Sequence, residues 1–222
     1  MTSKLLMKVL ALTAFTGQAH AVEMKLYETG PAQDSSFVRF INGTTAPMTV
    51  TAKGSKAQLA LGSSTPTTLF FPIRASTALE GTLTQGQQAR SVAIKVEPGE
   101  FASVVAVPGK DGFELNTLRE QPDDFNASKA SLALYQASGA CNNARLQVAG
   151  GKVALFENVA PSTVVRRQIN PIAVSVELVC DGQPTSVPLD LGTLGAGQRY
   201  SLVAVPADKG TRLFKVVDTV AN

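Results

Sequence analysis

An internal repeat of fifteen residues constrains the fold of this chain more than any other feature. Residues 98–112 align without gaps on residues 196–210, and seven positions are identical, including Val-Ala-Val-Pro at 105–108 and 203–206. In each copy a glycine turn precedes an apolar run, and a proline and a polar, glycine-containing turn follow it. Such a run is typical of a strand bounded by turns. Two copies of one β unit are the simplest architecture that accounts for the repeat.

The sequence around the two copies also predicts strands. Apolar and polar residues alternate with a period near two, and Gly, Pro, Asn or Asp interrupts the pattern about every 8 to 12 residues. The clearest strands are predicted at 91–96 and 174–180; segments 36–40 and 131–135 are candidates for matching first strands of the two units. Segment 128–137 fits either a helix or a strand.

We therefore expect an all-β protein with two tandem antiparallel β-sandwich domains. We place them at residues 30–118 and 130–222, joined by a short polar linker at 119–129 that contains Pro122. One larger sandwich or barrel is the alternative, which the repeat disfavours.

The first residues read as a secretory signal peptide at 1–21. Lys4 and Lys8 supply its positive charge, residues 9–15 its apolar stretch, and Ala19-His20-Ala21 the cleavage site, so we expect cleavage after Ala21. An uncleaved amino-terminal anchor is the alternative. No other stretch is apolar over the roughly 18 residues that a membrane span needs. We expect a periplasmic protein that is not transmembrane.

The charge balance argues against nucleic acid as a partner. Without the leader, 20 basic against 17 acidic residues become 18 against 17, and the longest basic run is Arg166-Arg167. A nucleic-acid binder shows a strong basic patch or stripe. No nucleic acid is therefore expected among the partners.

Cys141 and Cys180 form an even pair in an exported chain, which predicts a disulfide. A bridge across this loop stabilises by about 3 to 4 kcal/mol in the chain-entropy model. Cys180 shares a strand face with Val174 and Val176, which predicts that this face points into the core. The first half has no cysteine, so we expect it to be the less stable half. A free, nucleophilic Cys141 is the alternative.

The only histidine, His20, lies in the leader, and the chain has no tryptophan. Histidine is the usual general base near neutral pH, so the mature chain excludes Ser-His-Asp and Cys-His mechanisms. Ser55-Lys56 and Asp123-Asp124 are the candidate Ser–Lys and carboxylate pairs, which we interpret as solvated turn residues. No His/Cys cluster and no carboxylate-dense loop occurs, so we predict no catalytic residue, no metal and no cofactor.

Binding is the function class that remains. Asn42-Gly-Thr44 and Asn126-Ala-Ser128 fit glycosylation sequons but are interpreted as turns, and residues 70–73, Phe-Phe-Pro-Ile, are either core or a docking patch. An acidic polysaccharide could be held by eight basic side chains, whose alternative interpretation is scattered solvated charge: Lys53, Lys56, Arg74, Arg90, Lys95, Arg145, Arg166 and Arg167.

The chain resembles the AlgF family of alginate O-acetylation proteins. The resemblance covers nearly the whole length and is carried by the signal peptide, Leu26-Tyr27, Ser-Phe-Val-Arg-Phe-Ile-Asn at 36–42 and the paired Val-Ala-Val-Pro segments. It implies a non-catalytic accessory or adaptor protein of the periplasmic complex that acetylates O-2 and O-3 of mannuronate residues in alginate. The implied partners are a membrane-bound O-acyltransferase and periplasmic acetyltransferase proteins, with direct contact to alginate or polymannuronate left open.

Three other function classes stay open. A periplasmic chaperone with two immunoglobulin-like domains would need a basic pair in its cleft, which Val-Val-Arg-Arg at 164–167 faintly suggests. An acetyltransferase or acetyl carrier would act through a Ser or Cys side chain. An acidic-polysaccharide-binding module would show salt-sensitive affinity for polymannuronate.

Overall fold

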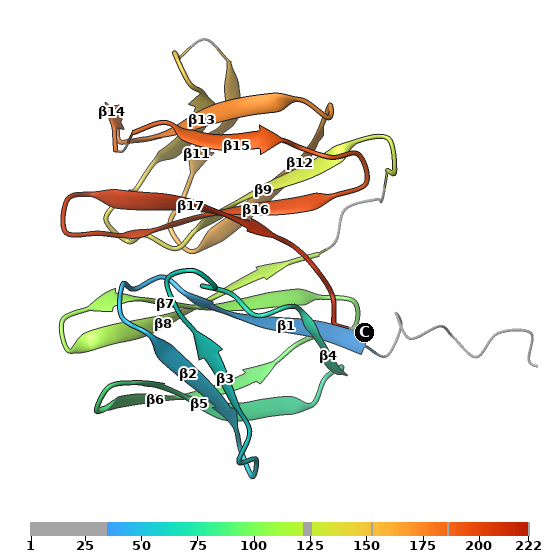
Figure 1. The fold of residues 1–222 in the computed structure, drawn as a ribbon, viewed down its shortest axis with the longest axis vertical. Coiled ribbons are helices and arrows are strands. Elements are labelled where there is room, and N and C mark those ends of the chain that lie inside the picture. The colour runs from blue at the N-terminus through green and yellow to red at the C-terminus, as the bar shows by residue number, and fades with distance from the viewer. Residues whose placement is uncertain (1–34, 122–125, 152, 186, 222) are drawn as a thin grey trace, which may run out of the picture.

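The computed structural model describes residues 35–121, 126–151, 153–185 and 187–221. In these ranges the chain forms four β-sheets and no helix, so the all-β prediction is confirmed (Figure 1). The signal peptide with Ala21, and the pair Asp123-Asp124, lie outside the described residues. Segment 128–137, which fitted a helix or a strand, contains a strand at Ala130–Gln136.

The first half of the chain forms two sheets, with strand orders β4-β1-β7-β8 and β3-β2-β5-β6. Apolar faces of both sheets contribute to one core, which includes Val38, Met48 and Val104. The strands are β1 (Ser35–Asn42), β2 (Met48–Ala52), β3 (Gln58–Leu61), β4 (Phe71–Arg74), β5 (Ala78–Gln85), β6 (Gln88–Lys95), β7 (Phe101–Gly109) and β8 (Gly112–Glu120).

The second half repeats this arrangement, with strand orders β12-β9-β16-β17 and β11-β10-β13, where both β14 and β15 pair with β13. Its core includes Leu134, Leu146 and Leu202. The strands are β9 (Ala130–Gln136), β10 (Ala144–Val148), β11 (Ala154–Val159), β12 (Thr163–Ile169), β13 (Ala173–Cys180), β14 (Gln183–Pro184), β15 (Leu189–Thr193), β16 (Arg199–Pro206) and β17 (Thr211–Val217).

The sequence repeat therefore corresponds to a structural repeat. Strands β7 and β16, which carry Val-Ala-Val-Pro, occupy the same interior place in matching sheets. The two halves thus share one strand order, β4-β1-β7-β8 against β12-β9-β16-β17 and β3-β2-β5-β6 against β11-β10-β13-β15.

Two details differ from the sequence-based expectation. Each half contains one parallel pair, β1 with β7 and β9 with β16. Parallel pairing is possible because the chain forms strands of the other sheet between these two strands, which gives a long crossover.

The sequence match between the predicted first strands, 36–40 and 131–135, is also wrong by one residue. Arg39 lies opposite Ser103, and Ala133 lies opposite the repeat-equivalent Ser201, so Arg39 corresponds to Ala133.

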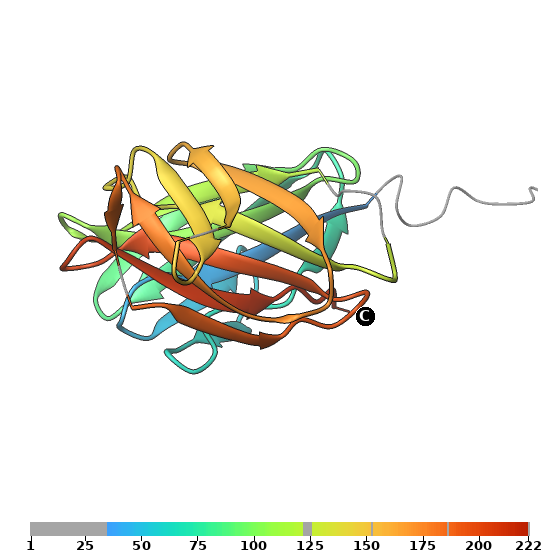
Figure 2. The ribbon, with the colours of Figure 1, turned by 90° about the horizontal axis from the view of Figure 1, so that it is seen from above.

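The two sandwiches meet through the sheets that carry the repeat (Figures 1 and 2). A third apolar cluster joins Ile41, Val105 and Val107 of the first half to Val203 and Val205 of the second, with no more than 8% of any of these side chains exposed. Burial of this apolar surface holds the halves face to face.

The end of the chain crosses from the second half to the first. Beyond β17, Val220 bridges Phe70 in parallel, the Phe70 N–H donates to the Thr219 carbonyl at 2.8 Å, and the Ala221 N–H donates to the Phe70 carbonyl at 2.8 Å. Figure 1 shows this end lying beside β1 and β4. The carboxyl-terminal segment is therefore an additional tie between the halves.

A disulfide joins Cys141, in the turn after β9, to Cys180 at the end of β13. The bridge ties the connection between β9 and β10, which runs from one sheet of the second sandwich to the other, to the end of β13. Val174, Val176 and Leu178 on β13 are buried together with Cys180, as the alternating pattern predicts.

Candidate functional site

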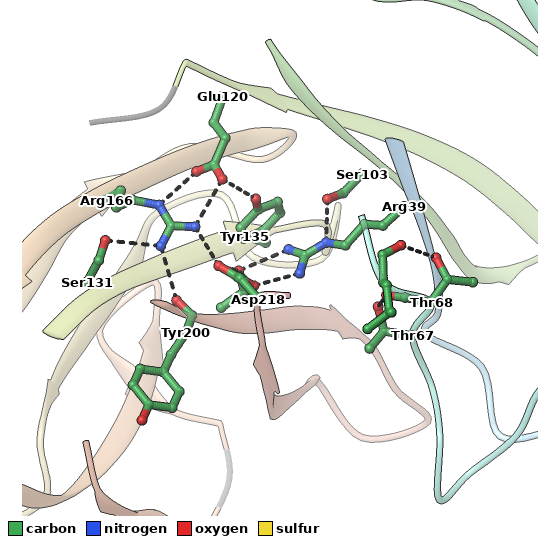
Figure 3. Close-up of polar contacts among 12 residues, drawn as sticks. Arg39, Thr67, Thr68, Ser103, Glu120, Ser131, Tyr135, Arg166, Tyr200 and Asp218 are labelled. Carbon is green, nitrogen blue, oxygen red and sulfur yellow. Dashed lines mark hydrogen bonds and ion pairs between the residues drawn. The ribbon is translucent and has the colours of Figure 1, made fainter. Parts of the chain in front are cut away.

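A group of buried polar side chains lies where the two sandwiches meet (Figure 3). We call it the interdomain cluster and define it by the two arginines, two acids, one tyrosine and two serines that bond to one another: Arg39, Ser103 and Glu120 from the first half, and Tyr135, Arg166, Ser201 and Asp218 from the second. At least three hydrogen bonds cross between the halves here, so the cluster is part of the interface.

Arg39 comes from the middle of β1 and points out of the first sandwich. Its Nη1 donates to Asp218 Oδ1 at 2.6 Å, and its Nη2 donates to Ser201 Oγ at 2.9 Å. Its Nε donates to Ser103 Oγ at 2.7 Å. The guanidinium carbon also lies 4.3 Å from the ring centroid of Phe70, close enough for a cation–π contact. A single side chain of the first half is thereby bound to two residues of the second.

Arg166 comes from β12 in the second half and forms the reciprocal contacts. Its Nε and Nη2 donate to the two carboxylate oxygens of Glu120, both at 3.0 Å, which is the bidentate geometry that favours arginine. Its Nη2 also donates to Asp218 Oδ2 at 2.8 Å. The Tyr135 hydroxyl donates to Glu120 Oε1 at 2.8 Å. Two cations and two anions therefore balance inside the interface.

The two acids occupy equivalent places in the two halves. Glu120 lies opposite Phe101 at the end of β8, and Asp218 donates its N–H to the carbonyl of Arg199, the repeat equivalent of Phe101. Each acid binds the arginine of the other half. The arginines are not equivalent, because Arg39 lies on β1 and Arg166 lies on β12, the counterpart of β4. The two crossing ion pairs therefore use matching acids but unrelated arginine positions.

The charged members of the cluster are almost completely shielded from water. Side-chain exposure is 1% for Arg39, 4% for Asp218, 6% for Arg166 and 7% for Glu120. Burial by itself raises the pKa of Asp218, but Arg39, Arg166 and the Ser201 hydroxyl outweigh it and lower this pKa below its ordinary value. Asp218 is therefore an anion at neutral pH.

Burial raises the pKa of Tyr135 to about 12, so its phenol stays neutral and donates a hydrogen bond to Glu120. Burial lowers the pKa of Arg166, but Glu120 and Asp218 more than compensate, and the net direction is upward. The carboxylates are saturated by strong donors and shielded from solvent. This chemistry suits them to holding the two halves together.

Close backbone packing accompanies the ion pairs. Gly43 donates its N–H to the Ala106 carbonyl at 2.7 Å and accepts from Arg212 Nη2 at 2.9 Å. A Cβ atom at this glycine would lie 2.6 Å from the Ala106 carbonyl oxygen and 2.8 Å from Val205 Cγ1. A side chain at Gly43, directly after β1, would therefore meet both the first half's own Ala106 carbonyl and Val205 of the second half.

The structure does not gather the sequence-predicted candidates into one site. Cys141 is bonded to Cys180 and fully buried, so neither is available as a thiol. Ser55 and Lys56 are exposed in the loop after β2. Within the described residues, no group of three or more His, Cys, Asp or Glu residues could hold a metal ion. Nor does a helix with the length and apolarity of a membrane span occur in the described ranges.

The binding candidates are likewise dispersed. Arg166 is buried and bound in the interdomain cluster, so it is not available to a polysaccharide. Asn42 is buried, and its side-chain amide donates to the Ala46 and Leu61 carbonyls, which excludes this sequon as a glycosylation site in the folded chain. The Asn126 side chain accepts from the Ser128 N–H, as in a turn. In residues 70–73, Phe70 is core, whereas Phe71 is only half-buried.

Sequence reasoning considered Arg166 but missed the other six members of the cluster, among them Arg39, Glu120 and Asp218. Two signals were present. Arg39 interrupts an otherwise apolar first strand, and Glu120 and Asp218 are separated by the same offset of 98 as the repeat. Extending the repeat alignment to these positions would have matched an acid with an acid.

These features define a class: an all-β protein of two sandwiches with matching strand order, locked together by buried, reciprocal ion pairs. The sequence profile of the family described as "Alginate O-acetyl transferase AlgF" matches residues 7–201, and the chain belongs to the AlgF family. The resemblance noted from the sequence is thereby confirmed.

The chain is also similar to individual proteins. It is 29% identical over 191 residues to "Alginate biosynthesis protein AlgF" of Pseudomonas aeruginosa, covering 85% of this chain and 80% of that protein. Among solved structures, it is similar to the C-terminal domain of AlgF from P. aeruginosa, with 25% identity, a TM-score of 0.35 and coverage of 40% and 98% of the two chains. A putative cell adhesion protein from Bacteroides ovatus has 11% identity, a TM-score of 0.28 and coverage of 85% and 97%.

Proposed function

We propose that this protein is a non-catalytic periplasmic adaptor of the machinery that O-acetylates alginate. Membership of the AlgF family supports a role in alginate biosynthesis. In the proposed role, the protein binds a membrane-bound O-acyltransferase and a periplasmic acetyltransferase protein and holds them at a fixed separation. The acetyl groups themselves are transferred by those partners.

The observation that carries this proposal is the interdomain cluster. Its arginines and acids are shielded from water and bound to one another, so they act in holding the sandwiches together. A locked pair of sandwiches turns its other two sheets, β3-β2-β5-β6 and β11-β10-β13-β15, away from each other (Figure 1). Two outward faces on one rigid body suit an adaptor that joins two partners.

The proposal is tested in a strain that lacks this protein. We expect alginate from that strain to lose its acetyl groups while polymer synthesis continues, and plasmid-borne protein to restore them. A pull-down with the purified mature protein should capture both the acyltransferase and the periplasmic acetyltransferase. Unchanged acetyl content in the deletion strain would contradict the proposal.

A second measurement separates an adaptor from an acetyl carrier. Intact-mass spectrometry of protein taken from acetylating cells should show the mature chain without an acetyl adduct, since Cys141 is held in a disulfide. A stoichiometric acetyl adduct that is lost when one serine is replaced by alanine would favour the carrier instead.

A further inference from the structure

An apolar groove opens in the first sandwich between its two sheets. It has a cavity volume of about 270 Å³, and its lining includes Val38, Phe40, Val50, Phe71, Ile73 and Leu59. The groove lies where edge strand β3 of one sheet and edge strand β4 of the other come together. Leu59 is 40% exposed, so the apolar lining continues to the surface.

The groove coincides with a short edge strand. β4 has four residues, and its pairing with β1 extends only from Arg74 to Phe71. The equivalent strand of the second half, β12, has seven residues and pairs along the whole of β9. Pro66, Thr67 and Thr68 continue along β1 through the Ile41–Thr67 bridge, so this edge of the first sandwich is formed by a short strand and irregular chain where its repeat has one continuous strand.

A groove with these properties is suited to an extended segment with alternating side chains. Edge strands present backbone N–H and C=O groups that an added strand can bind, while the groove accepts every second side chain. Filling the groove would also remove exposed apolar surface, which is favourable in proportion to its area.

The mature chain contains a segment with that pattern. Val22, Met24 and Leu26 alternate with Glu23 and Lys25, so an extended conformation would place three apolar side chains on one face. The pattern begins at the first residue after the predicted cleavage site.

The position of β1 brings this segment within reach. Ser35 pairs with Arg74, so the chain enters the first sandwich at the end of β4, next to Ile73 of the groove lining. Residues 22–34 can span about 43 Å when extended, at about 3.3 Å per residue. That length is enough to pass around the edge and lie along the groove, and tethering gives the segment a high effective concentration there.

We propose that residues 22–26 of the mature protein bind in this groove of their own chain, with Val22, Met24 and Leu26 facing into it. The segment would complete the edge of the first sandwich. Removal of the signal peptide would free this segment to bind, which couples export to completion of the fold. This inference does not depend on the adaptor function.

The test compares the mature protein with two variants at adjacent positions. Met24→Asp introduces a charge on the face that enters the groove, whereas Lys25→Asp introduces the same side chain on the opposite face. We expect Met24→Asp, and a chain that lacks residues 22–26, to bind the dye ANS several-fold more strongly and to exchange the amide hydrogens of residues 69–74 faster. Lys25→Asp should behave as the parent does.

A synthetic peptide of residues 22–34 should reverse both changes in the shortened chain, and all forms should be monomeric by light scattering. Equal dye binding and exchange in the parent and the shortened chain would overturn the proposal, as would equal effects of the two aspartates. A dimeric parent that dissociates when residues 22–26 are removed would assign the segment to a second copy and would also overturn it.

Discussion

The two halves of the molecule share one strand order, but the edges of the two sandwiches are held together in different ways. The second sandwich has a disulfide from the β9–β10 turn to β13, and a seven-residue edge strand, β12. The first sandwich has no cysteine, a four-residue edge strand, β4, and an open apolar groove. The comparison teaches that duplication preserved the sheets that face each other, while the edges of the sandwiches diverged.

The largest expected effect is at the shared interface. Arg39→Met keeps much of the side-chain volume but leaves Asp218 with Arg166 as its one remaining cation in the cluster. Removing one partner of a buried ion pair costs about 3 to 5 kcal/mol. We expect a loss of that size in the free energy of unfolding, measured by urea denaturation, with Arg74→Met at the exposed end of β4 as the control. A loss no larger than that of the control would refute the structural role of the cluster.

Removing the disulfide tests whether the two halves differ in stability. Replacing both Cys141 and Cys180 by serine should cost about 3 to 4 kcal/mol. By hydrogen exchange, amides that open by local unfolding should lose the most protection in β9–β17, whereas amides that open only by global unfolding should lose protection equally in both halves. The first half, expected from the sequence to be the less stable, should then approach or exceed the second in protection. An equal loss at the locally opening amides of both halves would contradict the expectation that the disulfide acts mainly on the second half.

A smaller effect is expected at Gly43, which packs closely against neighbouring residues of both halves. Gly43→Ala places a methyl group against the Ala106 carbonyl and Val205, and overpacking of this kind costs about 1 to 3 kcal/mol. Gly62→Ala is the matched control, because no atom lies within 4 Å of its added Cβ. Calorimetry should show a lower Tm for Gly43→Ala alone. Equal Tm values would mean that the interface can relax there.

Acid should weaken the interface through Asp218. Its folded pKa lies below the ordinary value of an aspartate, so its ionisation stabilises the fold fully above about pH 4. This contribution is lost as the pH falls through the folded pKa. As the pH falls below about 4, the parent should therefore lose more stability than Asp218→Asn does. Parallel pH profiles of the two proteins would contradict this assignment.

Much of the architecture could be predicted from the sequence, because local patterns carry it. The Val-Ala-Val-Pro repeat predicted two β units, and alternation on residues 174–180 predicted the buried face that carries Cys180. The parallel pairing of β1 with β7 could not be read in this way, since alternation looks the same in parallel and antiparallel strands.

The interdomain cluster was harder to predict because its members are far apart in the chain. Arg39 and Asp218 are 179 positions apart, and no local pattern connects them. The sequence suggested Arg166 as part of a basic pair in a cleft between domains. Arg166 does lie between the two halves, but its side chain is buried in an ion pair with Glu120. The pairing of opposite charges in this interface can be recognised only when it is known how the strands of the two facing sheets are aligned.

The most direct test of the account is differential scanning calorimetry of the mature protein at neutral pH. If the interdomain cluster makes the two sandwiches one rigid unit, the protein should melt in a single transition whose calorimetric and van't Hoff enthalpies agree. The Arg39→Met variant should then melt at a lower temperature. Two independent transitions in the parent protein would contradict the central claim that the halves are locked together.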